Sequence, residues 1–247
     1  MISESKQTGD FTFVVISDKG LNHRLNHIPN QDAVMYECKE EDFAIAVSDG
    51  VGSCQKSDIG AKSAVEAIRR LFPMLEAGKI GTEKETIADI IIKSWKNLIN
   101  DENIDDYCAT LKAVIKISNE LILISIGDGL LAVSSNGISK IAPMENTQFI
   151  NQTSCLNKNV KSTDFWISLF RLDTYIPYAV FLCTDGVANG ITEGQELELV
   201  REVETNIDGS LLKEELEKLV VSISEYSMDD RSVGVVKYER KNAKSDR

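Results

Sequence analysis

The sequence predicts an α+β fold in which helices cover antiparallel sheets. Three observations support this class: short apolar runs rich in β-formers are numerous, the helical patterns come grouped, and few strands alternate singly with helices. No Pro/Ser-rich linker and no repeat of fixed period interrupts the 247 residues. We therefore expect one domain over residues 1–247, with a core from about 10 to 238 and a polar tail at 241–247.

The expected strands are apolar, β-branched or aromatic, and several of them are bounded by Gly, Asp or Asn. They cover residues 11–17, 33–36, 43–47, 110–117, 121–126, 130–134, 165–172, 179–183 and 233–238. The spacing over 110–134 predicts a meander, with turns at Ser118-Asn119 and at Gly127-Asp128-Gly129.

Apolar residues at helical spacing predict helices at 59–75, 82–100, 195–203 and 211–224. We expect Pro73 and Gly78 to mark the end of the first helix. The second begins with Thr82-Glu83-Lys84-Glu85, which has the pattern of a capping box.

Composition excludes several function classes. Lys and Arg number 27 and Asp and Glu 39, which gives a net charge of −12 and disfavours binding to nucleic acid or to anionic membranes. The chain start lacks a signal-peptide pattern, and no apolar run is long enough to span a membrane. The five cysteines form no CxxC pair, so we expect free thiols and a cytoplasmic location. With two histidines, any metal must be held mainly by oxygen.

Carboxylates stand at the ends of the expected strands. Three apolar runs end in Asp-Gly, and further aspartates directly precede two other strands: Asp49-Gly50, Asp128-Gly129, Asp185-Gly186, Asp229-Asp230 and Asp32. A single Asp-Gly can be explained by turn chemistry alone. Carboxylates gathered at one rim, however, repel each other and take up protons unless a cation is present. Mg²⁺ and Mn²⁺ prefer oxygen ligands, so the pattern favours a divalent-cation site.

Taken together, these segments resemble the metal-dependent protein phosphatases of type 2C. The resemblance covers about residues 10–238 in the family's order, through Asn30-Gln31-Asp32-Ala33, Ser48-Asp49-Gly50-Val51-Gly52, Ile59-Gly60-Ala61, Ala109-Thr110-Leu111, Gly127-Asp128-Gly129, Thr184-Asp185-Gly186 and Asp229-Asp230-Arg231-Ser232-Val233. It implies a four-layer α-β-β-α sandwich of two antiparallel sheets flanked by helix pairs. It also implies hydrolysis of phosphoserine and phosphothreonine in proteins by a water that bridges two Mn²⁺ or Mg²⁺ ions.

The resemblance also implies roles for individual residues. Asp49 would bridge both metals and the Gly50 carbonyl would bind the second, while Asp185 and Asp229 would complete the shell of the first. We take Asp49, Asp185 and Asp229 as the catalytic set.

Further residues would act around these ligands. Asp128 would pair with Asp185 at a third metal, as in bacterial members, and Asp32 would act through water in the outer shell. Gln31 and Asp230 are expected beside the ligands without binding metal directly.

Three differences from the family pattern matter. Gln31 stands where many members have a Glu that binds the second metal through water, and Val51 stands where eukaryotic members have a His. Arg24 lies seven residues before Gln31, whereas the family's phosphate-binding Arg lies four or five before the Glu-Asp pair. Arg24 and His23 are the candidate phosphate contacts, with a solvated charge and a loop cap as the alternative interpretations.

Two alternatives to the phosphatase hypothesis stay open. Gln31 and Val51 motivate a pseudophosphatase, a binding module with little or no turnover, and the chemistry also allows a hydrolase of small phosphate esters. The expected partners are a Ser/Thr-phosphorylated protein and a cognate kinase, with no nucleic acid and no membrane. The polar stretch 144–164 is the candidate region for substrate selection.

Overall fold

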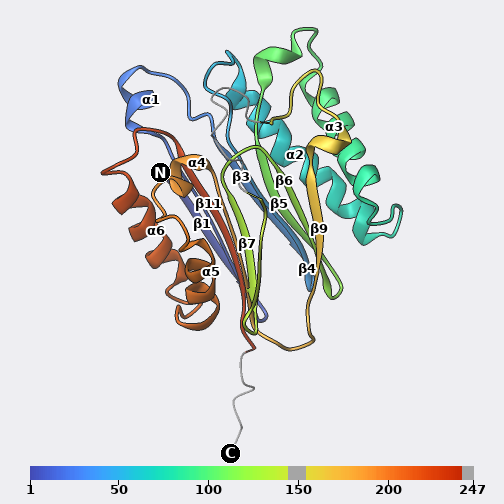
Figure 1. Ribbon diagram of the computed structural model, residues 1–247, viewed down its shortest axis with the longest axis vertical. Coiled ribbons are helices and arrows are strands. Elements are labelled where there is room, and N and C mark those ends of the chain that lie inside the picture. Colours follow the sequence, from blue (N-terminus) through green and yellow to red (C-terminus); the bar gives the residue numbers. More distant parts are fainter. Residues whose placement is uncertain (144–153, 241–247) are drawn as a thin grey trace, which may run out of the picture.

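Two antiparallel sheets face each other between two pairs of helices (Figure 1). The computed structural model describes residues 1–143 and 154–240. The expected polar tail (241–247) and residues 144–153 of the candidate region for substrate selection lie outside the described residues. This arrangement confirms the α+β class and the four-layer sandwich.

The first sheet contains both ends of the described chain. Its strands, in spatial order, are β1 (Ile2–Thr8), β2 (Phe11–Asp18), β11 (Arg231–Tyr238), β10 (Tyr178–Cys183), β7 (Leu130–Ser135) and β8 (Ile138–Ile141). The helices α5 (Glu196–Thr205) and α6 (Leu212–Ile223) cover its outer face.

The second sheet is built from the middle of the chain. Its strands, in spatial order, are β3 (Ala33–Lys39), β4 (Asp42–Ser48), β5 (Leu111–Ile117), β6 (Glu120–Ile126) and β9 (Trp166–Arg171). The helices α2 (Ser57–Glu76) and α3 (Lys84–Ile99) cover its outer face. Four short helical segments complete the described structure: α1 (Leu21–Leu25), η1 (Ile104–Tyr107), η2 (Ser162–Asp164) and α4 (Asp185–Ala188).

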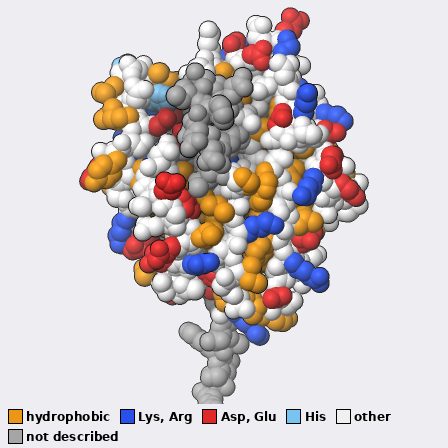
Figure 2. Space-filling view, viewed as in Figure 1, with side chains coloured by type: hydrophobic (Ala, Val, Ile, Leu, Met, Phe, Trp, Pro, Cys, Tyr) orange, Lys and Arg blue, Asp and Glu red, His pale blue; other side chains and the backbone are white. Residues whose placement is uncertain are grey.

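Apolar side chains fill three layers, which explains why the strands are nearly continuous hydrophobic runs. In β4, Ala44 and Ala46 face the helices, while Phe43, Ile45 and Val47 face the other sheet. Small residues on the helix side let α2 pack close to the sheet. On the surface viewed in Figure 2, acidic and basic side chains are interspersed, so the acidic excess forms no single patch there.

Of the two turns predicted for the meander over 110–134, only the first joins strands of the same sheet. The Ser118-Asn119 turn joins β5 to β6 within the second sheet, but Gly127-Asp128-Gly129 carries the chain from β6 across to β7 in the first sheet. Gly127 and Gly129 have φ values of +87° and +90°, a backbone conformation that favours glycine. Because β6 and β7 are buried on both faces, their sequences contain no alternation that would assign them to a sheet.

Other differences from the expected elements are local. The edge strands β1 and β8 are not among the predicted strands, because β1 is largely polar and β8 is short. Pro73 lies inside α2, which ends at Glu76. The second long helix begins at Lys84, and its N-cap residue Glu83 makes no side-chain capping bond, so the predicted capping box is absent. All five cysteines are free, and no helix of the described residues is long and apolar enough to cross a membrane.

Candidate metal centre

The antiparallel registers bring the strand-end aspartates to one end of the sandwich. Ala33 pairs with Ser48, so the residues just outside them, Asp32 and Asp49, lie at the same end of the second sheet. In the first sheet, Cys183 pairs with both Leu130 and Val233. The segments at this end therefore carry Asp32, Asp49, Asp128, Asp185, Asp229 and Asp230.

The Asp49-Gly50 turn is held by its neighbours. The Asp49 amide donates to Thr110 Oγ1 (3.0 Å), and the Thr110 amide donates to the Asp49 carbonyl (2.8 Å). The Gly50 amide donates to the Gln31 carbonyl (3.1 Å). A Cβ added at Gly50 would lie 2.6 Å from the Ser57 carbonyl oxygen, so this close approach requires glycine.

The buried Asp32 carboxylate is only partly satisfied by hydrogen bonds. Thr184 Oγ1 donates to its Oδ2 (2.9 Å), whereas Oδ1 is buried and has no amide, hydroxyl or amine donor among the described residues. The Asp49 carboxyl group lies within hydrogen-bond reach of Asp32. Two acceptors therefore face each other unless a proton or a cation lies between them.

The pKa values report the same crowding. Burial raises the pKa of Asp32 to about 7, and the charge of Asp230 adds to that effect. Burial, followed by the charges of Asp32, Asp185 and Asp128, raises the pKa of Asp49 well above its usual range. Burial and the charges of Asp128 and Asp229 raise the pKa of Asp185 to about 6. These carboxyl groups therefore hold protons to higher pH than ordinary aspartates do, and a bound metal ion would relieve the repulsion among their charged forms.

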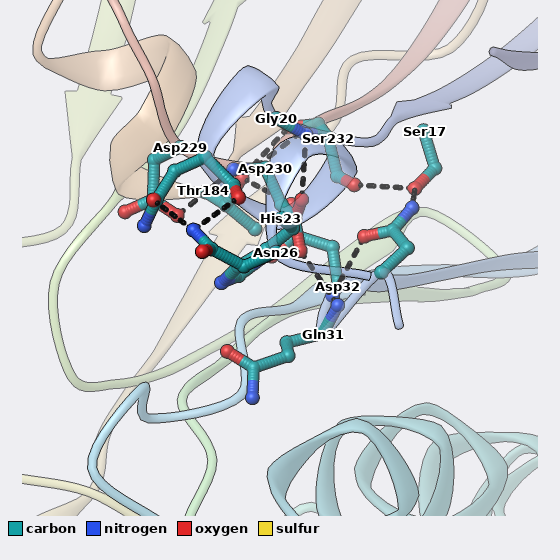
Figure 3. Close-up of polar contacts among 12 residues, drawn as sticks. Ser17, Gly20, His23, Asn26, Gln31, Asp32, Thr184, Asp229, Asp230 and Ser232 are labelled. Carbon is teal, nitrogen blue, oxygen red and sulfur yellow. Dashed lines mark hydrogen bonds and ion pairs between the residues drawn. The ribbon is translucent and has the colours of Figure 1, made fainter. Parts of the chain in front are cut away.

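Asp230 has the opposite environment, because donors surround it (Figure 3). The carboxylate accepts the Gly20 amide at Oδ1 (2.6 Å) and the Gln31 amide at Oδ2 (2.6 Å), and His23 Nδ1 lies 2.8 Å from Oδ2. Asp229 is exposed, and its Oδ1 accepts the Asp230 amide (2.8 Å). Asp230 thus fastens the loop between β2 and β3 to the start of β11.

The two candidate phosphate contacts engage different carboxylates. Buried His23 is directed at Asp230, whereas Arg24 Nη2 donates to Asp18 Oδ1 (2.6 Å) with half of its side chain exposed. Figure 3 shows the Gln31 side chain directed away from Asp230.

Two supporting interactions at this end were not anticipated from the sequence. Asp18 also accepts Arg231 Nη2 (2.6 Å), which links β2 to β11. Buried Lys112 donates from Nζ to Ser125 Oγ (2.7 Å) and to the Gly127 carbonyl (2.5 Å). Its sequence signal is a lysine between the apolar residues Leu111 and Ala113 of β5.

The residues at this end fit a divalent cation in their chemistry. Carboxylates and a glycine carbonyl are oxygen donors of the kind that Mg²⁺ and Mn²⁺ take, and the Asp32 Oδ1 atom lacks a donor. Within residues 1–143 and 154–240, no three Asp, Glu, His or Cys side chains already converge to enclose an ion. Binding of a divalent cation would therefore bring closer together carboxylates that repel each other without it.

Comparisons with known proteins agree with this geometry. The family model described as Protein phosphatase 2C matches residues 19–220. The serine/threonine phosphatase stp of Listeria innocua serovar 6a is 21% identical over 246 residues, covering 91% of this chain and 94% of that protein.

Solved structures show the same fold at low sequence identity. A bacterial serine phosphatase superposes with a TM-score of 0.70 at 12% identity, covering 96% of this chain and all of that chain. The catalytic domain of the serine threonine protein phosphatase PstP, in complex with two manganese ions, gives a TM-score of 0.65 at 15% identity, covering 93% of this chain and 98% of that one. With the family model matching most of its length, this chain belongs to the protein phosphatase 2C family.

Proposed function

We propose that the chain hydrolyses phosphoserine and phosphothreonine in proteins at a centre of two Mn²⁺ or Mg²⁺ ions. The observation that carries this proposal is the pair of facing carboxyl groups of Asp32 and Asp49, buried at the strand ends of a phosphatase 2C fold. Such a pair is unfavourable without a cation and favourable with one.

The ligands we propose follow the carboxylates described above. Asp49 would bridge both ions, the Gly50 carbonyl would bind the second, and Asp185 with Asp229 would hold the first. Asp128, whose charge acts on Asp185, would share a third ion with it. Bound divalent ions supply Lewis acidity and positive charge for attack of water on a phosphoryl group.

The chain's own residues would position these groups. Thr110 fixes the Asp49 backbone, and Thr184 orients Asp32 through its hydroxyl. Gln31 and Asp230 would support the centre from beside it, Gln31 through its carbonyl contact with the Gly50 amide. These residues hold the metal ligands in place without touching the substrate.

We propose that Arg24 and His23 contact the substrate phosphate. Arg24 is half exposed, and to reach a phosphate it would have to leave Asp18, where Arg231 would remain as the partner of that carboxylate. His23 is anchored through Nδ1, so only its Nε2 edge could contact a ligand.

The proposal is tested by phosphopeptide hydrolysis with Mn²⁺, with chelator, and with the variant Asp49→Asn. Asp89→Asn is the matched control, because Asp89 is exposed on α3, the helix that covers the outer face of the second sheet. We expect chelator and Asp49→Asn to abolish turnover and Asp89→Asn to keep it. Unimpaired turnover by Asp49→Asn would refute the mechanism.

Two further measurements address the remaining alternatives. Calorimetric titration that detects no Mn²⁺ binding would favour a pseudophosphatase, and faster turnover of nucleotides or sugar phosphates than of phosphopeptides would favour a small-ester hydrolase. We also propose a cytoplasmic location, in keeping with five free cysteines, and a cognate kinase that supplies the phosphoprotein.

A further inference from the structure

Three cysteines far apart in sequence meet beside the Asp49-Gly50 turn. Gly50 forms an isolated antiparallel bridge with Ala109, and Ala109 forms a second one with Leu156. The resulting short ribbon places three segments side by side, and each segment contains one cysteine: Cys54, Cys108 and Cys155.

The ribbon register places Cys108 and Cys155 on the same face. Because Ala109 is paired with Leu156, Cys108 stands opposite Asn157, and Cys155 lies two residues before Asn157. Residues two apart on a strand share a face, so Cys155 is the diagonal neighbour of Cys108.

A turn brings the third thiol to the same place. The Val51 amide donates to the Cys108 carbonyl (3.0 Å), and the Cys54 amide donates to the Val51 carbonyl (2.9 Å). The thiol of Cys108 accordingly lies within hydrogen-bond reach of both Cys155 and Cys54. Cys108 is the shared neighbour of the other two.

The three thiols differ in access. Cys108 is buried and its thiol donates to the Asp105 carbonyl (3.2 Å), whereas Cys54 and Cys155 are half-buried. The hydrogen bond with Cys155, then burial and the contact with Cys54, hold the pKa of the Cys108 thiol far above its usual range. An oxidant from solvent therefore reaches Cys54 or Cys155 first. Cys108 is buried beside them and stays a protonated thiol.

We propose that this cluster is a redox modification site, in which Cys108 forms a reversible disulfide with Cys54 or Cys155 when the protein meets hydrogen peroxide. The half-buried thiol and H₂O₂ give a sulfenic acid and water. The Cys108 sulfur then attacks the sulfenic sulfur, the Cys108 proton passes to the departing hydroxyl group, which leaves as a second water, and the S–S bond forms. Two electrons pass from the two sulfurs to the peroxide.

A thiolate metal site is a less suitable explanation for the cluster. A central Cys108 with one neighbour on each side fits pairwise bond formation instead. The disulfide would tie the segment that follows Asp49-Gly50, or the one that contains Leu156, to the segment that contains Thr110.

Peptide mapping tests the proposal without reference to phosphatase activity. The full chain is treated with H₂O₂, free thiols are alkylated, and a non-reducing tryptic digest is analysed by mass spectrometry. Trypsin places every cysteine in a separate peptide: 25–39, 40–56, 97–112, 141–158 and 172–201. Cys38→Ser is the matched control, because Cys38 lies in β3 and its sulfur accepts Lys6 Nζ (3.3 Å).

We expect wild type and Cys38→Ser to lose two alkylatable thiols per chain and to yield peptide 97–112 linked to 40–56 or to 141–158. Dithiothreitol should reverse the linkage. Cys108→Ser keeps a donor for the Asp105 carbonyl and should instead accumulate sulfinic acid at Cys54 or Cys155. Circular dichroism and melting of that variant confirm that it is folded. The proposal is overturned if Cys108 stays alkylatable in oxidised wild type, or if the linked peptides come from different chains.

Discussion

Raising the pH of the metal-free protein from 5 to 8 should destabilise it, because buried carboxyl groups must then lose their protons. Asp32 and Asp185 have folded-state pKa values of about 7 and about 6, both above the ordinary value of 3.8. Such a group binds more protons in the folded state than in the unfolded state. Its stabilising contribution is therefore complete below pH 3.8 and is lost as the pH rises through the folded-state pKa.

Asp32 and Asp185 set the least magnitude of this effect, and Asp49, whose pKa is also raised, adds to it in the same direction. Between pH 5 and 8, Asp32 moves through about two pH units below its pKa of about 7, and Asp185 through about one unit below its pKa of about 6. At about 1.4 kcal/mol for each unit, these two groups alone should lower the free energy of unfolding by roughly 4 kcal/mol. Asp18, whose pKa is lowered by Arg231 and Arg24 despite burial, titrates below this window and does not contribute.

Urea unfolding in the presence of chelator, at pH 5 and at pH 8, measures this difference. Asp32→Asn keeps an oxygen for the Thr184 hydroxyl and removes the titration of this residue, so it should make the pH dependence clearly smaller. Mn²⁺ should raise the melting temperature more at pH 8 than at pH 5, because it competes with protons for the same oxygens. Metal-free stability that is flat or increases from pH 5 to 8 would refute this reasoning.

Three substitutions test the support around the centre, each by urea unfolding. Asp230→Ala leaves three buried donors without their acceptor and should cost on the order of 3 kcal/mol; a cost near zero would mean that water replaces the carboxylate. Lys112→Met leaves the Gly127 carbonyl without its donor and should cost about 2 kcal/mol, whereas a gain in stability would show that burial of the ammonium group dominates. Gly60→Ala places a Cβ against the Tyr107 carbonyl oxygen and should cost at least about 2 kcal/mol, unless η1 moves aside without loss.

The sequence was informative where the structure depends on local chemistry. Asp-Gly after an apolar run ends a strand, whichever sheet that strand joins, so Asp49, Asp128 and Asp185 could be placed at strand ends without knowing the pairing. The resemblance supplied the pairing of the layers. Residue periodicity could not, since β6 and β7 are apolar on both faces and so contain no sign that they belong to different sheets.

Contacts between segments distant in sequence could not be predicted from residue types. Asp18 and Arg231 are 213 positions apart, and only the register of β2 with β11 makes them partners. The same holds for Cys54, Cys108 and Cys155, which look scattered along the chain and meet through two isolated bridges. No local pattern distinguishes a cysteine in a cluster from one that packs alone.

The supply of hydrogen-bond donors separates two kinds of carboxylate at this end of the sandwich. Asp230 and Asp18 are each met by several N–H groups, which stabilise their charge and commit them to holding the fold together. Asp32 accepts the Thr184 hydroxyl at Oδ2, has no amide, hydroxyl or amine donor at Oδ1 among the described residues, and faces Asp49, whose charge burial opposes. A cation is therefore expected at Asp49, with Asp32 facing it through water, and not at Asp230, although Asp230 is also a buried acid. Residue type and position at a strand end are the same for these aspartates. The hydrogen-bond donors around each one decide whether it holds the fold together or faces a cation.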